Sequence, residues 1–432
     1  MGFQQGLSGL NASAKALDVV GNNIANSGTV GFKGARGEFA DVFAASLSGG
    51  GGSQVGVGTG LSNVTQQFTQ GNITTSSNGL DLAINGGGFF RISNNGAITY
   101  TRNGQFQVDK SGFVVNAGGL RLQGYAADYN IDPAGIIVPS TPTDIFIDPS
   151  DLQPKSTDLL TVGLNLDSRE DVPPSGHTVF SLADPLSYTA STSVTLYDSL
   201  GNPHVMAMYF TKTANPGEWE VRASIDGTSE TLVDLGFGLG VPATLTFDTS
   251  GSMNLINGGA VSPIPASIDL DAVSTALGLT NNAAATIDFE INMASLTQFG
   301  STFGVTQLVQ TGFSSGRLAG LSVSADGIVQ GRYSNGQNRN MGQVVLAKFN
   351  NPNGLLSLGG NQWQETSESG APLVGSPGSG SNGVIQSAAI EESNTDLTAE
   401  LVNMITQQRA YQANAQTIRT QDQVLQTLVN LR

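Results

Sequence analysis

The sequence predicts an α+β fold of several domains, with a helix at each end of the chain and mainly antiparallel β structure between them. The chain has 56 glycines and 16 prolines, yet no proline falls within residues 3–26 and neither residue type occurs after Gly383. Between the ends, short β-branched or aromatic runs alternate with glycine turns of the kind that close hairpins. A chain of 432 residues exceeds one ordinary core, so two or three domains are expected.

Composition excludes several classes of function. The net charge is −16 and the 18 Lys and Arg residues are scattered, which disfavours nucleic acid as a partner. Cysteine is absent, so a disulfide framework, a cysteine metal site and a thiol nucleophile are excluded. No apolar run reaches the roughly 18 residues of a membrane span, so no membrane partner is expected. The first residues lack a basic region and a continuous apolar region, which disfavours a cleavable signal peptide.

The N-terminal helix is expected over residues 3–26. Its apolar residues recur at the 3.5-residue spacing of a coiled-coil seam, with Gly21 as a gap. Gly28 and Gly31 are expected to end the helix. The seam residues are Leu7, Leu10, Ala14, Leu17 and Ile24.

Two glycine-rich segments separate the helices from the body of the chain. Residues 44–60 and 372–383 have low complexity, and we expect them to connect domains flexibly. The candidate hinge glycines are Gly49, Gly50, Gly51, Gly52, Gly378, Gly380 and Gly383. The predicted domains are a coiled-coil-like helical domain (1–30 and 390–432), connecting segments (31–71 and 366–389), an inner β domain (72–144 and 306–365) and an outer β domain inserted into it (145–305).

The body contains recognisable strand and hairpin patterns. Residues 89–93, 97–102, 105–109 and 113–116 predict a meander, and 194–210 predict a hairpin that turns at Ser199–Pro203. A late group at 316–336 and 342–349 has a similar pattern. The proline-bearing stretch 133–185 indicates a domain boundary.

The C-terminal helix is expected over residues 394–430, a length of roughly 55 Å at 1.5 Å per residue. Ser393 followed by Asp396 resembles a capping box, and Asp396 and Glu400 suit the positive end of the helix dipole. The apolar seam residues are Leu401, Met404, Tyr411, Ile418, Leu425 and Val429, with the polar Gln408 and Asp422 between them as candidate register-setting residues. This apolar stripe widens toward the end of the chain.

Two readings of the terminal helices stay open. They could form an ordinary helical bundle that caps a globular domain. Alternatively, both could pack against other copies of the same chain, since the longer C-terminal helix is apolar on more than one side and large apolar surfaces mark interaction sites.

Catalytic and ligand-binding signals are weak, and we expect no enzyme activity, no metal and no cofactor. His177 and His204 stand in unrelated contexts, so no helical two-histidine metal site is expected. The GVGTG run at 56–60 lacks the lysine of a nucleotide-binding loop. DYNIDPAG at 128–135 begins like a calcium loop but has Pro133 where the turn glycine belongs. Asp269 and Asp271 form an isolated Asp-x-Asp pair.

The segment Ala25–Phe39 (ANSGTVGFKGARGEF) resembles the N-terminal signature of the bacterial flagellar axial rod and hook family. The segments 79–92, 100–125, 331–355 and 393–432 resemble further blocks of that family, so the likeness covers roughly half of the chain. The length and the segment 198–210 resemble the hook members, because rod subunits lack the outer insertion. The signature residues are Asn26, Thr29, Gly31, Phe32 and Lys33.

This resemblance implies a structural subunit that polymerises into a hollow, bendable tube and transmits torque from rod to filament as a universal joint. The terminal helices would form the inner tube and the β domains its outer layers. Implied partners are other copies of the chain, the distal rod, the hook cap, the hook–filament junction proteins and the flagellar type III export apparatus. The implied location is the extracellular flagellum, reached without cleavage of a signal peptide.

Three alternatives are kept. A related rod or hook–filament junction subunit is the nearest. A secreted β-rich adhesin or carbohydrate-binding protein with an oligomerising stalk would explain the acidic body, but it would not explain heptads at both ends. A hydrolase would need two close carboxylates in a cleft, and Asp269 with Asp271 is its best pair.

Overall fold

The computed structural model describes residues 2–42, 56, 58–129, 134–259 and 263–430, and the chain divides into two compact units. The terminal unit comprises Met1–Pro149, Ala319–Arg332 and Asn338–Arg432, and the inserted unit comprises Ser150–Leu318 and Tyr333–Gln337. The inserted unit extends past residue 305, the boundary suggested by the sequence, because β22 (Gly304–Gln310) pairs with β12 (Leu159–Asp167).

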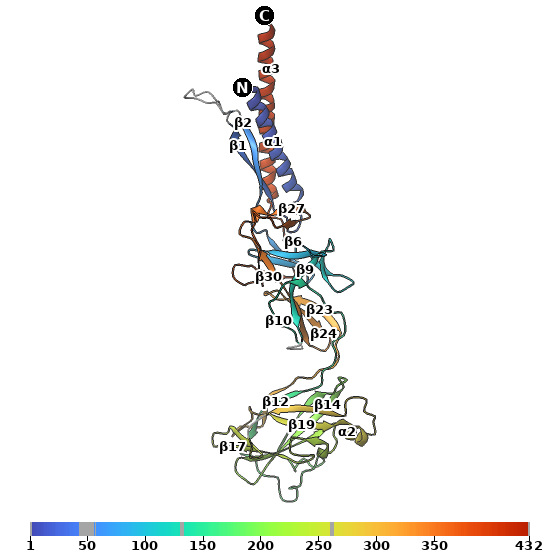
Figure 1. Cartoon of the computed structure of the whole chain (residues 1–432). Helices are drawn as coiled ribbons and strands as arrows, with labels where there is room; N and C mark the ends of the chain where they lie inside the picture. Colours follow the sequence, from blue (N-terminus) through green and yellow to red (C-terminus); the bar gives the residue numbers. More distant parts are fainter. Residues whose placement is uncertain (1, 43–55, 57, 130–133, 260–262, 431–432) are drawn as a thin grey trace. The chain divides into compact units, whose positions relative to one another are not determined.

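The chain ends form two long helices, α1 (Gly2–Ala25) and α3 (Leu397–Asn430), which lie alongside each other (Figure 1). α3 begins three residues later than the predicted start at 394, because Asp396 is its N-cap. The Asp396 carboxylate accepts hydrogen bonds from the amides of Thr398 (2.8 Å) and Ala399 (3.2 Å). The predicted capping role of Ser393 is wrong, since its hydroxyl pairs with that of Thr395 outside the helix.

The segments expected as connectors contain paired strands. β1 (Ala35–Val42) and β2 (Gly58–Gln66) form an antiparallel hairpin with a bulge between Glu38 and Phe39. The later segment pairs with the terminal unit's own strands: β29 with β26, β30 with β4, and β31 with β3. The bounds are β3 (Ile73–Thr75), β4 (Leu82–Asn85), β29 (Leu373–Gly375), β30 (Val384–Ser387) and β31 (Ala389–Glu391).

The largest sheet of the terminal unit joins 14 described strands, with the main path β23-β24-β25-β9-β5-β6-β28-β27. Aromatic rings fill part of its core, where Phe89 contacts Phe349 and Trp363 edge to face. The remaining strands branch from β9, β5, β8 and β26. The bounds are β5 (Phe89–Asn94), β6 (Ala97–Thr101), β7 (Phe106–Val108), β8 (Val114–Asn116), β9 (Arg121–Asp128), β10 (Ile136–Ile137), β11 (Thr143–Asp144), β23 (Leu318–Val323), β24 (Ile328–Tyr333), β25 (Asn338–Val344), β26 (Leu346–Lys348), β27 (Leu356–Gly359) and β28 (Gln362–Gln364).

The expected meander is only partly present. β5 and β6 pair as a hairpin, but β9 lies on the other side of β5, while β7 and β8 form a separate pair attached to β9. Short turns alone do not determine which strand is the next neighbour in a sheet.

The inserted unit packs a sheet of six described strands, in the order β16-β19-β20-β12-β21 with β22 beside β12, on a sheet of five, β13-β14-β15-β17-β18. Alternate residues of both sheets point into one core, as in a β-sandwich. The predicted turn at Ser199–Pro203 lies between β13 and β14. The bounds are β13 (Ala190–Tyr197), β14 (Pro203–Lys212), β15 (Glu218–Ile225), β16 (Val233–Asp234), β17 (Ala243–Phe247), β18 (Met253–Ile256), β19 (Ile264–Asp269), α2 (Leu270–Leu277), β20 (Thr286–Asn292) and β21 (Thr297–Phe299).

The fold class predicted from the sequence is therefore confirmed: terminal helices accompany antiparallel sheets, and one β unit is inserted into another. Two of the described strand pairs, β12 with β20 and β12 with β21, are parallel.

Candidate assembly surface at the chain ends

The two terminal helices pack antiparallel. A Cβ placed on Gly6 would lie 3.0 Å from Cγ1 of Ile418, and one placed on Gly9 would lie 2.8 Å from Nδ2 of Asn414. At the other end of α1, Asn23 Nδ2 donates to Glu400 Oε1 at 3.2 Å. Residue numbers thus rise along α1 as they fall along α3.

The buried face of α1 is made of small and polar residues. Its buried positions are Gly6, Ser13, Ala16 and Asn23, which follow a 3.5-residue pattern of their own. Small side chains allow two helix backbones to approach closely, and at Gly6 the absence of a side chain leaves room for Ile418 of α3.

The apolar seam predicted for α1 is less buried than this small-residue face. Leu7 is 44% exposed, whereas Leu10, Ala14, Leu17 and Ile24 are half-buried. On α3, Ile418 faces Gly6 of α1 and is half-buried, as is Met404, whereas the polar Gln408 and Asp422 are exposed. The large apolar residues of α3 that the structure leaves exposed are Leu397, Leu401, Val402, Ile405, Tyr411, Val424, Leu425 and Val429.

The β1–β2 hairpin lies along another side of α1. Gln5 Nε2 donates to the carbonyl of Gly56 at 2.7 Å, and the amide of Thr59 donates to Ser8 Oγ at 3.3 Å. Near the root of the helices, Asn23 Nδ2 also donates to the carbonyl of Ala35, at 2.8 Å. The helices and the hairpin therefore form one three-part element.

The signature residues form the turn that leaves α1. Thr29 Oγ1 donates to Asn26 Oδ1 at 3.2 Å, and the amide of Phe32 donates to the Thr29 carbonyl. Gly31 has a φ of +71°, and a Cβ there would lie 2.6 Å from the Asn103 amide nitrogen. Lys33 is buried.

Lys33 enters a buried ionic cluster. Its Nζ lies 2.6 Å from Oε1 of Glu391, and Nη1 of Arg102 lies 3.1 Å from Oε2 of the same carboxylate. Burial lowers the pKa of the Lys33 ammonium, and the Glu391 charge partly opposes that shift. The sequence analysis did not select Glu391 or Arg102. It also did not select Asn23 or predict its hydrogen bond with Glu400.

The hinge candidates fall into two groups. Gly49, Gly50, Gly51 and Gly52 lie outside the described residues. The later three belong to a turn in which the amide of Gly378 donates to the carbonyl of Gly383 (2.9 Å) and the amide of Gly383 donates to the carbonyl of Gly87 (2.8 Å). That turn is bonded to the body of the terminal unit, and a hinge role for Gly378, Gly380 and Gly383 stays a prediction.

The aspartates and histidines considered for chemistry have structural partners in the inserted unit. Asp269 is the N-cap of α2 and accepts from the amide of Ala272 at 2.9 Å, while Asp271 pairs with Asn281. His177 lies 2.5 Å from Asp184 and His204 lies 2.7 Å from Asp226. In the GVGTG run, Gly58 and Gly60 belong to β2. Part of the 128–135 segment lies outside the described residues.

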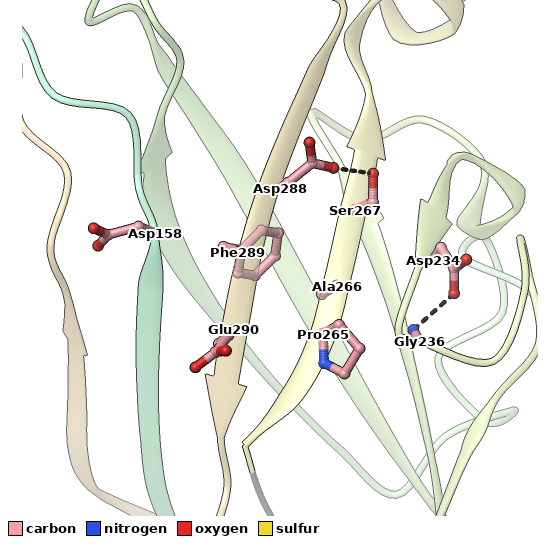
Figure 2. A pocket seen from close by; sticks show the side chains of 9 residues that line it. All are labelled: Asp158, Asp234, Gly236, Pro265, Ala266, Ser267, Asp288, Phe289 and Glu290. Carbon is pink, nitrogen blue, oxygen red and sulfur yellow. Dashed lines mark hydrogen bonds between the residues drawn. The ribbon is translucent and has the colours of Figure 1, made fainter.

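An acidic cavity of about 510 Å³ lies beside β19 and β20 of the inserted unit (Figure 2). Three of its carboxylates have partners: Asp288 accepts from Ser267 Oγ at 2.7 Å, Asp234 accepts from the amide of Gly236 at 2.7 Å, and Asp158 forms an ion pair with Lys155 at 2.8 Å. Asp158 and Glu290 also line it, whereas Asp269 and Asp271 do not. Across the described residues, no three His, Asp or Glu side chains gather in a way that could hold a metal ion.

No helix in the described part of the chain is long and apolar enough to cross a membrane.

Comparison with known proteins decides the family. Residues 3–33 match the family described as flagella basal body rod protein, and 83–150 match the flagellar hook protein FlgE/F/G D1 domain. Residues 165–313 match the flagellar basal body protein FlaE D2 domain, and 386–431 match the flagellar basal body rod FlgEFG protein C-terminal family. The flagellar hook protein FlgE of Salmonella typhimurium is 42% identical over 100% of both chains. The chain belongs to the flagellar hook protein family.

Two further members of the hook family extend this result. The flagellar hook protein FlgE of Escherichia coli is 41% identical, again over 100% of both chains. The crystal structure of Helicobacter pylori flagellar hook protein FlgE2 shares the fold, with a TM-score of 0.50 and 14% identity over 74% of this chain and 100% of that one. The hook-family resemblance predicted from the sequence is thus confirmed.

Proposed function

We propose that this hook-family subunit polymerises by burying the outward apolar faces of α1 and α3 between copies of the chain. As a member of the hook family, the chain is a structural subunit of the hook, the polymer that joins rod to filament in the bacterial flagellum. The observation that supports the proposed interface is the exposure of large apolar side chains along both helices, Leu7 on α1 and Val402 and Ile405 on α3 among them.

The energetics favour contacts between copies. Burying one Leu, Val or Ile side chain contributes roughly 1.5–3 kcal/mol. Inside one chain, α1 contacts α3 through small and polar residues, so most of this apolar surface is still available. Gly2, the first residue of α1, lies next to Gln421 of α3. α3 continues beyond this point, and Val424, Leu425 and Val429 in its continuation are exposed.

The proposed mechanism of bending places stiff helices inside and compact β units outside. A tube that rotates while bent must shorten on one side as it lengthens on the other. Low surface charge and abundant Ser, Thr, Asn and Gln groups suit contacts whose water bridges re-form during each turn. We retain Gly49–Gly52 and the Pro377–Gly383 turn as candidate compliant segments. Bending at the Pro377–Gly383 turn would have to break two backbone hydrogen bonds, one between Gly383 and Gly87 and one between Gly378 and Gly383.

The remaining assignments belong to the same proposal. The distal rod, the hook cap and the hook–filament junction proteins would contact the two ends of the polymer. Export through the flagellar type III apparatus, without cleavage of a signal peptide, would deliver the chain to the outside of the cell. No catalytic activity and no cofactor enter this function.

Assembly of the double variant Val402→Ser/Ile405→Ser tests the interface. Both side chains are exposed, at 59% and 50%, so the variant is expected to keep the fold of the single chain and to lose tube formation. The matched control is Val179→Ser in the inserted unit, where the side chain is 81% exposed. Electron microscopy of each protein concentrated in precipitating salt gives the readout. Tubes of normal yield from the double variant would refute the interface.

A further inference from the structure

Three charged side chains meet at the root of the terminal helices almost without contact with solvent. Lys33 is 1% exposed, Glu391 1% and Arg102 4%. Only 12% of the residues are charged, and burying an unpaired charge is costly, so three buried charged side chains in contact are unusual in this chain. Its formal charge is +1, from two cations and one carboxylate.

The carboxylate of Glu391 holds several separate segments together. Its Oε1 accepts from Lys33 Nζ at 2.6 Å and from the amide of Gly71 at 2.9 Å, and its Oε2 accepts from Arg102 Nη1 at 3.1 Å. The backbone carbonyl of the same residue accepts from the amide of Gly31 at 2.7 Å. Glu391 therefore joins the signature turn, the segment after β2 and the body of the terminal unit to the last strand before α3.

Among the residues that the structure describes, Glu391 is the anion that pairs with both cations. Lys33 Nζ also donates to the Thr69 carbonyl at 2.7 Å, and Arg102 Nη2 donates to the Gly86 carbonyl at 2.9 Å. Carbonyl groups supply hydrogen bonds but no neutralising charge. Arg102 Nε has no hydrogen-bond partner among the described residues. Burial lowers the pKa of Arg102 as well as that of Lys33.

We propose that the Glu391 carboxylate is a latch, a positioning residue that fastens the helical root to the body of the terminal unit. Without it, two like charges would be buried side by side, and the root would open so that water could reach them. Opening would release the segments 26–36, 66–72 and 389–396, while the rest of the chain stays folded. This inference concerns the single chain and holds whether or not the chain polymerises.

The latch also sets a condition on the order of folding. Lys33 and Glu391 are 358 positions apart, and Arg102 and Glu391 are 289 apart. Both cations come from the first part of the chain and the carboxylate from its end. The root can therefore close only after the C-terminal segment has docked, and a chain that ends before Glu391 should keep it open.

The variant Glu391→Gln, compared with Glu392→Gln, tests the latch. Glutamine keeps the size of the side chain and removes its charge, and the neighbouring Glu392 is exposed. In the monomer we expect Lys33 to react with an acylating reagent at least about tenfold faster in Glu391→Gln, because opening exposes it. Hydrogen exchange should rise in peptides covering 26–36 and 66–72 and should not rise in the inserted unit. In Glu392→Gln both readouts should match the unmodified chain.

The variant Lys33→Met gives an independent check. It leaves Arg102 and Glu391 as a neutral pair, so we expect exchange in 66–72 to rise less than in Glu391→Gln. Equal behaviour of Glu391→Gln and Glu392→Gln would overturn the latch, as would a larger effect of Lys33→Met than of Glu391→Gln. Increased exchange throughout the inserted unit would also overturn it, since opening would then not be confined to the root.

Discussion

Gly31 and Gly28 belong to the same turn after α1, yet a methyl group should have different effects on stability at the two positions. Gly31 has a φ of +71° and its Cβ would lie 2.6 Å from the Asn103 nitrogen, whereas a Cβ on Gly28 would meet nothing within 4 Å. We expect Gly31→Ala to lower the free energy of unfolding of the terminal unit by on the order of 1–3 kcal/mol. Gly28→Ala should leave it unchanged or raise it by about 0.4–1 kcal/mol. Denaturant titration measures both, and equal effects would contradict the assigned backbone strain.

Asp167 gives a prediction about pH in the inserted unit. The Arg169 guanidinium donates to its carboxylate at 2.9 and 2.7 Å and, with the Arg169 amide, lowers the pKa of Asp167 to about 2. A carboxyl group whose pKa is lowered on folding stabilises the fold above its unfolded pKa of roughly 3.9. That contribution is lost as the pH falls through about 2.

The variant Arg169→Met should therefore raise the pKa of Asp167 toward its ordinary range, as followed by NMR titration of the carboxyl carbon. Its loss of stability should be present above about pH 4 and should disappear below about pH 2, where the carboxyl is protonated in both proteins. Arg317→Met is the control, because Arg317 is 87% exposed on its side chain and lies 4.0 Å from Asp151. A pKa of Asp167 that does not move in Arg169→Met would contradict the assigned cause.

Single residues also show how far the sequence could be read. Lys33 could be selected because it belongs to a family signature. Its partner could not, since nothing local distinguishes the buried Glu391 from the exposed Glu392, and the ion pair spans 358 positions. Asn23, which joins Glu400 and Ala35, was likewise hidden within a helical pattern.

At the scale of elements, α1 carries two patterns with the same period. Hydrophobic periodicity selects Leu7, Leu10 and Leu17, whereas the face packed on α3 holds Gly6, Ser13 and Ala16. A search for apolar residues therefore predicts the helix correctly but does not select the small residues that are its most buried positions. The small-residue face becomes recognisable only when close approach of two backbones is considered. The sequence also predicted too little regular structure in the connecting segments. β1 and β2 contain glycine, and each is stabilised by pairing with the other, which the sequence of one strand alone does not reveal.

The absence of cysteine permits a direct test of the helix register. The pair Gly6→Cys/Ile418→Cys should form an intramolecular disulfide upon mild oxidation, because a Cβ at residue 6 lies 3.0 Å from Cγ1 of Ile418. Gly21→Cys/Ile418→Cys should not, since a Cβ at residue 21 meets nothing within 4 Å. Mass spectrometry of digested monomer measures the yield. Efficient crosslinking of the control pair would contradict the antiparallel register.

At the scale of the whole molecule, the insertion of one β unit into another was visible in the sequence, but its boundaries were not. Among the described residues, the fully buried core of the inserted unit runs from Leu160 to Leu296, and the partly buried Phe303 and Leu308 pack against it. The unit extends beyond residue 305, the boundary suggested by the sequence, because β22 pairs with β12, the first long strand of the unit. Pairing between strands that are far apart in the chain leaves no local trace in composition.

The two tryptophans allow the units to be followed separately, because Trp219 is buried in the core of the inserted unit and Trp363 in that of the terminal unit. In a Trp363→Phe background, fluorescence reports the inserted unit, and in a Trp219→Phe background it reports the terminal unit. Since each unit has its own core, we expect Leu164→Ala to destabilise only the Trp219 transition, by about 2–5 kcal/mol. The matched substitution Leu122→Ala, equally buried in β9, should lower only the Trp363 transition. If either substitution shifted both denaturation curves together, the chain would unfold as one cooperative body, and the division into two units would not describe its energetics.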